Sequence, residues 1–158
     1  DGIRDDLVTG VQTCALPILD FLGNEFFILY GDSYLPINYL EVQSQFFEFD
    51  CEALMVVYRN NNLYDISNSE FMSKNILRYN KRNPKKTMHH IDYGLSVVRS
   101  NLFKKYDANV FLDLADVFED LSDKNSLFGL EVEQRFFEVG SHKGLSELEN
   151  YPFLQERS

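Results

Sequence analysis

The sequence predicts an α/β domain that is Rossmann-like, with a mixed but mostly parallel sheet and flanking helices. Two short runs, residues 26–30 and 53–58, are apolar or aromatic throughout, which is typical of strands buried on both faces in the middle of a sheet. Between them, apolar side chains recur at helical spacing, at Tyr39, Val42, Phe46 and Phe49. A strand, a helix and a neighbouring strand form a βαβ unit, whose crossover we expect to be right-handed.

Further strands are expected in the middle of the chain. Residues 67–72 and 76–80 predict a hairpin, although their alternation of apolar and polar residues is imperfect. Residues 91–98 predict another strand, and it contains Gly94. A glycine inside a strand often marks a bulge or a place where another group approaches the backbone closely.

The last third of the chain continues the pattern of helices and strands. Apolar residues between Leu112 and Leu121 recur at helical spacing, and residues 127–132 predict a late strand. Ser141 is a good N-cap, so we expect a final helix to begin after it.

The composition indicates one domain with a sizeable core. The chain has 158 residues, 44% of them hydrophobic, and a formal net charge of -10. Nucleic-acid binding without sequence preference requires clustered Lys and Arg, and the acidic balance argues against it. The sequence predicts neither a membrane span nor a signal peptide. Cys14 and Cys51 form no metal pattern and no disulfide framework, so we expect a reducing cytoplasm.

The two ends of the chain are interpreted separately from the domain. Residues 1–18 resemble the translated frame of a common sequencing-library adapter, and we treat them as foreign, which removes Cys14 from any functional argument. On this interpretation the native protein begins near Leu19 and its true amino terminus is missing. We expect a partial domain over residues 19–151 and a frayed tail over residues 152–158.

The first candidate site follows the strand at residues 26–30. Gly31, Asp32 and Ser33 come directly after it, at the edge where ligands bind in open α/β sheets. Gly31 lets the backbone turn or lie close to a ligand, and Asp32 offers a hard oxygen suited to Mg²⁺. Taken alone, these residues also form an ordinary turn.

The same tripeptide is found in the nucleophile block of GDSL-type serine esterases. Ser33 would then be the nucleophile, and it would need a histidine base oriented by an acid. These esterases carry that pair as Asp-x-x-His near the carboxyl end, whereas Val139 lies three residues before His142 here. The missing acid makes the esterase the weaker interpretation.

A second arrangement joins Asp32 to Glu138. Both follow or end apolar runs, so both can reach one edge of a sheet and share a Mg²⁺ with substrate phosphates. A basic loop over residues 81–86 supplies a cation for those phosphates. Within it Lys81 ends an alternating run and can point into a cleft, whereas a solvated surface position is expected for Arg82, Lys85 and Lys86.

Five segments together resemble one family. They occur in order, as FFILYGDSYL, VYRN, YNKRNP, IDYGLSV and FFEVGSHKGL, at residues 26–35, 57–60, 79–84, 91–97 and 136–145. The chain resembles the sugar-1-phosphate nucleotidyltransferases over residues 19–151, most of all the branch of small bacterial enzymes that includes heptose-1-phosphate guanylyltransferases. The resemblance implies a GT-A-like nucleotidyltransferase fold without its first βα portion.

The resemblance also implies a reaction and a site. The phosphate of a sugar 1-phosphate attacks the α-phosphorus of a nucleoside triphosphate, which gives a nucleotide sugar for bacterial polysaccharide and releases pyrophosphate. Asp32 and Glu138 would bind Mg²⁺, and Lys81 would contact the sugar phosphate. The substrate would lie against the residues Gly31, Asn80, Asp92 and Gly94.

Departures from the family limit what carries over. Many relatives have Asp in place of Glu138, an acid in place of Asn80, and a proline directly after Lys81, where this chain has Arg82 and Asn83. Nothing before Leu19 resembles the family's glycine-rich loop, whose backbone N–H groups hold the triphosphate. We therefore expect this polypeptide to bind nucleotide poorly and to turn over little. The rival is a non-catalytic sugar-phosphate-binding or interaction module.

Overall fold

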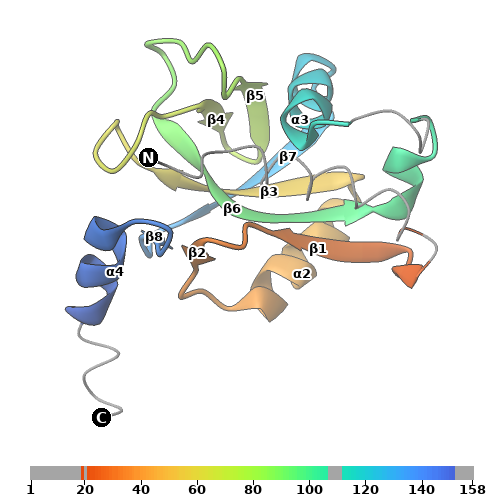
Figure 1. The fold of residues 1–158 in the computed structure, drawn as a ribbon. Coiled ribbons are helices and arrows are strands. Elements are labelled where there is room, and N and C mark those ends of the chain that lie inside the picture. The colour runs from red at the N-terminus through yellow and green to blue at the C-terminus, as the bar shows by residue number, and fades with distance from the viewer. Residues whose placement is uncertain (1–18, 20, 107–111, 152–158) are drawn as a thin grey trace.

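A six-stranded mixed sheet forms the centre of the computed structural model, which describes residues 19, 21–106 and 112–151 (Figure 1). The expected adapter segment, residues 1–18, and the expected tail, residues 152–158, lie outside the described residues. The strands follow the order β1 (Glu25–Leu29), β6 (His90–Arg99), β3 (Ala53–Arg59), β7 (Leu127–Val132), β5 (Asn75–Tyr79) and β4 (Ser69–Met72). The α/β class with flanking helices is confirmed.

The expectation of a mostly parallel sheet is wrong. Only β3 and β7 pair in parallel among the described strands, and the other pairs in this sheet are antiparallel. The strands β1 and β3 are also not neighbours, because β6 lies between them and pairs with both. Since β6 is antiparallel to each, β1 and β3 still run in the same direction. The hydrogen-bonding partner of β1 therefore comes from a distant part of the chain.

The strand β1 lies at the edge of the sheet, and the prediction of burial on both faces is wrong for it. Phe26 and Ile28 pack against the core, while Phe27 and Leu29 remain 39% and 50% exposed. The ring of Phe27 contacts Tyr39 edge-on, at 6.0 Å between centroids. An edge strand whose outward-facing side chains are partly covered can therefore have the same apolar sequence as a central strand that is buried on both faces.

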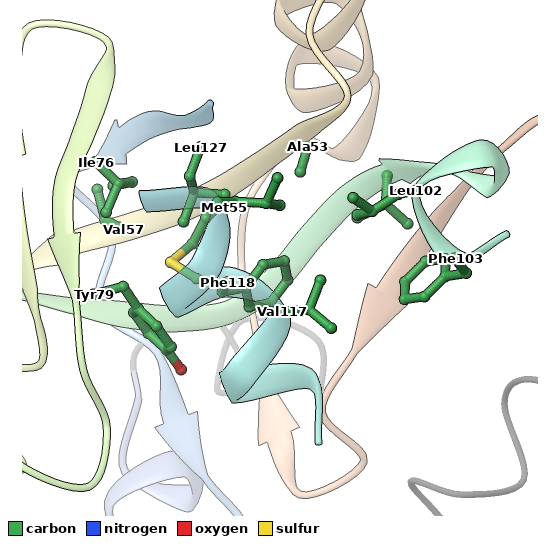
Figure 2. Close-up of a cluster of buried hydrophobic side chains, with 12 residues drawn as sticks. Ala53, Met55, Val57, Ile76, Tyr79, Leu102, Phe103, Val117, Phe118 and Leu127 are labelled. Atoms are coloured by element: carbon green, nitrogen blue, oxygen red, sulfur yellow. The ribbon is translucent and has the colours of Figure 1, made fainter. Parts of the chain in front are cut away.

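Both faces of β3 are buried, as predicted. Its residues alternate between two clusters, each covered by a helix. Figure 2 shows the first cluster, in which Ala53 and Met55 of β3 meet Val117 and Phe118 of α3 (Leu114–Asp123). The second cluster lies against α2 (Tyr39–Phe49), on the opposite face of the sheet in Figure 1.

The remaining predicted elements are present. The strands β4 and β5 form the expected antiparallel hairpin. Ser141 caps α4 (His142–Glu149), and its hydroxyl oxygen accepts from the backbone N–H of Gly144. In the described part of the chain, no helix is both long and apolar enough to cross a membrane.

A second, two-stranded sheet lies at one end of the central sheet and carries the candidate site. It pairs β2 (Ser33–Tyr34) with β8 (Phe137–Glu138) in antiparallel register, with Ser33 opposite Glu138. In Figure 1 this small sheet lies beside α4. We call residues 32–34 and 137–149 the rim.

Candidate functional site

The rim brings Asp32 and Glu138 together although they are far apart in the sequence. Because Ser33 pairs with Glu138, the residues next to them also meet, and the backbone N–H of Val139 donates to the carbonyl of Asp32 at 2.7 Å. Both acidic side chains are exposed, and both line the same cavity, of about 180 Å³. The predicted proximity of these two residues at one edge of the fold is confirmed.

Three other predicted residues line the same cavity, namely Lys81, Asp92 and Gly94. Gly31 and Asn80 are not among its lining residues. The side-chain amide of Asn80 donates to Oε1 of Glu119 on α3 at 2.6 Å, and its oxygen accepts from the backbone N–H of Asn83 at 2.6 Å. The polar groups of Asn80 are thus used within the protein, and its role toward a substrate stays a prediction.

Asp92 lies at the buried floor of the cavity and is heavily hydrogen-bonded. The hydroxyl groups of Tyr30 and Tyr79 donate to its Oδ2 at 2.7 and 3.4 Å, and the backbone N–H of Gly94 donates to its Oδ1 at 2.9 Å. Burial raises the pKa of Asp92, while the hydrogen bonds and the charge of Lys81 oppose that rise. Burial, and next the charge of Asp92, raise the pKa of both tyrosines, so their hydroxyl groups stay protonated donors.

Lys81 is a cation whose charge acts on Asp92 at this floor. Its Nζ lies 5.1 Å from the centroid of the Tyr30 ring, a cation–π contact. Its side chain is exposed and lines the cavity, so the ammonium group can reach an anion there. The chain supplies a second cation, Lys143, on the α4 side of the same cavity.

Gly94 is required by the local backbone. Its φ of 88° is a left-handed conformation that side chains disfavour. A Cβ there would also lie 3.2 Å from Cδ2 of Tyr30 and 3.3 Å from Oγ of Ser33. The glycine therefore lets β6 pass beneath both residues, while its N–H holds Asp92.

Gly144 brings α4 against the strand that carries Glu138. A Cβ at this position would lie 1.6 Å from the carbonyl oxygen of Glu138, which is closer than two non-bonded atoms can approach. With Gly144 in place, the first turn of α4 packs directly on β8. The sequence analysis identified the Ser141 cap but not this contact, because nothing local distinguishes Gly144 from any other glycine in a helix.

Arg135 is a cavity residue that the sequence analysis missed. Its guanidinium lies 4.0 Å from the centroid of the Tyr64 ring and 4.4 Å from that of Phe137, and it forms an ion pair with Glu147 at 2.6 Å. It links the loop after β3 to the rim. The only signal for Arg135 in the sequence was a cation next to Phe136 and Phe137. Its other partners, Tyr64 and Glu147, lie farther away along the chain.

The chemistry of the two carboxylates fits Mg²⁺. Among the described residues, no group of three or more His, Cys, Asp and Glu side chains could hold a metal ion. Asp32 and Glu138 by themselves could therefore supply only part of a coordination sphere. Mg²⁺ is usually held by one or two carboxylates together with substrate phosphates and water, so this pair suits a magnesium ion that arrives with a phosphate.

Among the residues that the structure describes, the groups that a serine esterase needs do not come together around Ser33. The hydroxyl of Ser33 donates to Oδ1 of Asp32 at 3.3 Å. In the described parts of the chain, the residues that line the cavity include no histidine. Ser33 therefore has no base beside it within this cavity.

The comparisons with known proteins identify the fold. No protein-family model matches the sequence, and no curated protein is significantly similar to it. Among solved structures, a protein assigned as a glucose-1-phosphate thymidylyltransferase from Bacillus anthracis aligns with a TM-score of 0.72 at 13% identity, covering 86% of this chain and 58% of that one. The fold is that of the nucleotidyltransferases.

Two further structures agree. A UTP-bound UGPase from Acinetobacter baumannii aligns with a TM-score of 0.69 at 14% identity, covering 88% of this chain and 54% of that one. The inositol-1-phosphate CTP transferase from T. maritima aligns with a TM-score of 0.65 at 17% identity, covering 84% of this chain and 57% of that one. The chain thus spans a little more than half the length of the structures it matches.

Proposed function

We propose that this chain belongs to a nucleotidyltransferase that acts on a sugar 1-phosphate. In this reaction a phosphate oxygen of the sugar 1-phosphate attacks the α-phosphorus of a nucleoside triphosphate. The new P–O bond gives a nucleotide sugar, and the bond to the β-phosphate breaks to release pyrophosphate. Charge neutralisation and positioning would provide most of the rate enhancement.

One observation carries this proposal. Asp32 and Glu138 lie on the two paired segments of the rim and line one cavity together with Lys81, in a fold shared with nucleotidyltransferases. Two carboxylates and a cation around one cavity suit a magnesium phosphate complex.

Each residue then receives a role. Asp32 and Glu138 would hold Mg²⁺, which when bound neutralises charge on the phosphates. Lys81 would contact the sugar phosphate, and Asp92 and Gly94 would lie against the sugar because both line the cavity. Gly31 and Asn80 would contribute through the backbone turns that carry Asp32 and Lys81.

Pyrophosphate release tests the proposal. The chain, and the longer protein read from the DNA upstream of it, are assayed with the nucleoside triphosphates and a panel of sugar 1-phosphates, with and without Mg²⁺. We expect release to require Mg²⁺ and to fall by orders of magnitude in Asp32→Ala. The matched control is Asp123→Asn, an exposed carboxylate at the end of α3 that is outside the cavity. Unchanged release in Asp32→Ala would remove Asp32 from the site.

The rival is a non-catalytic module that binds a sugar phosphate or a partner. It predicts that a sugar 1-phosphate binds without any pyrophosphate release. The upstream DNA separates the two. A continuous reading frame that encodes a glycine-rich loop with an arginine supports the enzyme, and a genuine start codon near Leu19 supports the module.

A further inference from the structure

We propose that Arg82 and Asn80 are positioning residues that hold Lys81 at the cavity by anchoring its loop to α3. The side chains of Asn80, Lys81 and Arg82 point alternately toward α3, the cavity and α3. Lys81 lines the cavity, whereas the side chains of Arg82 and Asn80 both bind acidic residues of α3 or its cap. The loop is thus attached to α3 on both sides of Lys81.

The anchor on the α3 side is a row of acidic residues. Asp113, Asp116 and Glu119 are spaced three residues apart, so they follow one face of the helix and its cap. The guanidinium of Arg82 donates to Oδ2 of Asp113 at 2.5 Å and also forms an ion pair with Asp116. Asn80 donates to Glu119 at 2.6 Å, one turn further along the helix.

Two further hydrogen bonds of Asn80 complete the anchor. Its N–H donates to the carbonyl of Asn68 at 2.9 Å, next to the loop that forms another wall of the cavity. Its side-chain oxygen accepts from the N–H of Asn83, which closes a turn around Lys81. Lys81 consequently lies between two anchored positions of the loop, and its side chain extends toward Tyr30.

This arrangement offers a structural reason for two departures from the pattern of the family that the sequence resembles. Asn80 and Arg82 stand where relatives often have an acid and a proline. In this chain both side chains attach the loop to α3. Exposed ion pairs contribute little to stability and are screened by salt, so the expected effect is on the position of Lys81 and not on folding.

The first experiment tests the position of Lys81 without any substrate. The lysines of the chain are acetylated with limiting reagent, and the rate at each site is measured by mass spectrometry. We expect Lys81 to react about two- to fivefold faster in Arg82→Ala, as its amine leaves the Tyr30 ring, with Lys85 and Lys86 unchanged. The double variant Asp113→Asn/Asp116→Asn should have the same effect and should not add to Arg82→Ala.

A matched control removes a different ion pair of α3. Lys124 pairs with Asp120 at 2.7 Å on the same helix and is outside the cavity. Lys124→Ala should leave the Lys81 rate unchanged. An unchanged Lys81 rate in both Arg82→Ala and the Asp113/Asp116 double variant would overturn the proposal, as would an equal rise in Lys124→Ala.

The second experiment uses glucose 1-phosphate with Mg²⁺ as the probe, and it rests on the proposed function. We expect Arg82→Ala to weaken binding about two- to fivefold in the native background and to have no effect in Lys81→Ala, because Arg82 would act only through Lys81. Equal weakening in both backgrounds would overturn the positioning role. Failure of the unmodified chain to bind this probe, together with the expected acetylation pattern, would count against the proposed function alone.

Discussion

The central sheet and the rim are stabilised in different ways. In β3, the residues from Ala53 to Val57 are completely buried between two helices. The rim consists of a pair of two-residue strands and a short helix, and its two candidate metal ligands are exposed. Apolar burial is the dominant favourable term in folding. In the rim, Phe137 is the one buried apolar side chain, and the other contacts are a few hydrogen bonds, one close glycine contact and the ion pair of Glu147 with Arg135.

This difference indicates that a substitution can change the site without unfolding the central sheet. The rim meets the sheet through short strands and a turn, so few buried contacts connect them. Local opening costs less free energy where buried apolar contacts are few. We expect core substitutions to unfold both regions together and rim substitutions to affect the site first.

The largest effect is expected for Phe118→Ala. Phe118 is 1% exposed and packs edge-on against Tyr79 at 6.0 Å between ring centroids. Figure 2 labels both residues in the first core cluster. Removing a buried phenyl group leaves a cavity and costs about 3–5 kcal/mol. Urea unfolding followed by circular dichroism measures this loss. The control is Phe47→Ala on α2, where the ring is 51% exposed and the loss should be much smaller. Similar losses in the two variants would contradict the assignment of the core.

A smaller and local effect is expected for Gly144→Ala. The added Cβ cannot lie 1.6 Å from the carbonyl oxygen of Glu138, so α4 must move away from β8. Hydrogen exchange should become faster in residues 137–149 and remain unchanged in β3. Gly140→Ala is the control, because its Cβ would lie 3.4 Å from Cβ of Asp32, an ordinary contact. Faster exchange in β3 of Gly144→Ala would show that the rim and the sheet unfold together.

The smallest effect is a dependence on pH at the boundary between the two regions. Burial raises the pKa of Asp92 above its usual 3.8, so the folded protein keeps this proton after the unfolded chain has lost it. The contribution of Asp92 to stability is therefore full below pH 3.8 and is lost as the pH rises through the folded pKa. As the pH rises over that range, Asp92→Asn should become more stable relative to the native chain, and at higher pH the difference in their free energies of unfolding should stay constant.

A second carboxylate provides a control of opposite sign. Lys124 and Lys105 lower the pKa of Asp120, so its contribution is present above the usual pKa of 3.8 and is lost as the pH falls through the folded value. Urea unfolding of the native chain, Asp92→Asn and Asp120→Asn over a pH series compares the two. Parallel curves for both variants would contradict the different environments of these residues.

Local pattern accounted for most of the elements. The run at residues 53–58, the spacing of Val42 and Phe46, and the cap at Ser141 each depend on neighbours within a few residues, and each matches the structure. The proximity of Asp32 and Glu138 was predicted from the ends of apolar runs and from a family resemblance, and the pairing of β2 with β8 explains it. The roles of these residues stay predictions.

The order of the strands and the details of the site depended on distant pairings. An apolar run predicts a strand, but it does not show which strand pairs with its edge, so the position of β6 between β1 and β3 could not be predicted from it. The contacts of Arg82 with α3 and of Arg135 with Tyr64 likewise join segments that share no sequence period. The sequence by itself determined where most helices and strands lie and that the run at residues 53–58 is buried on both faces. Only the tertiary structure decided which of the charged residues meet, because such contacts depend on how the whole chain packs.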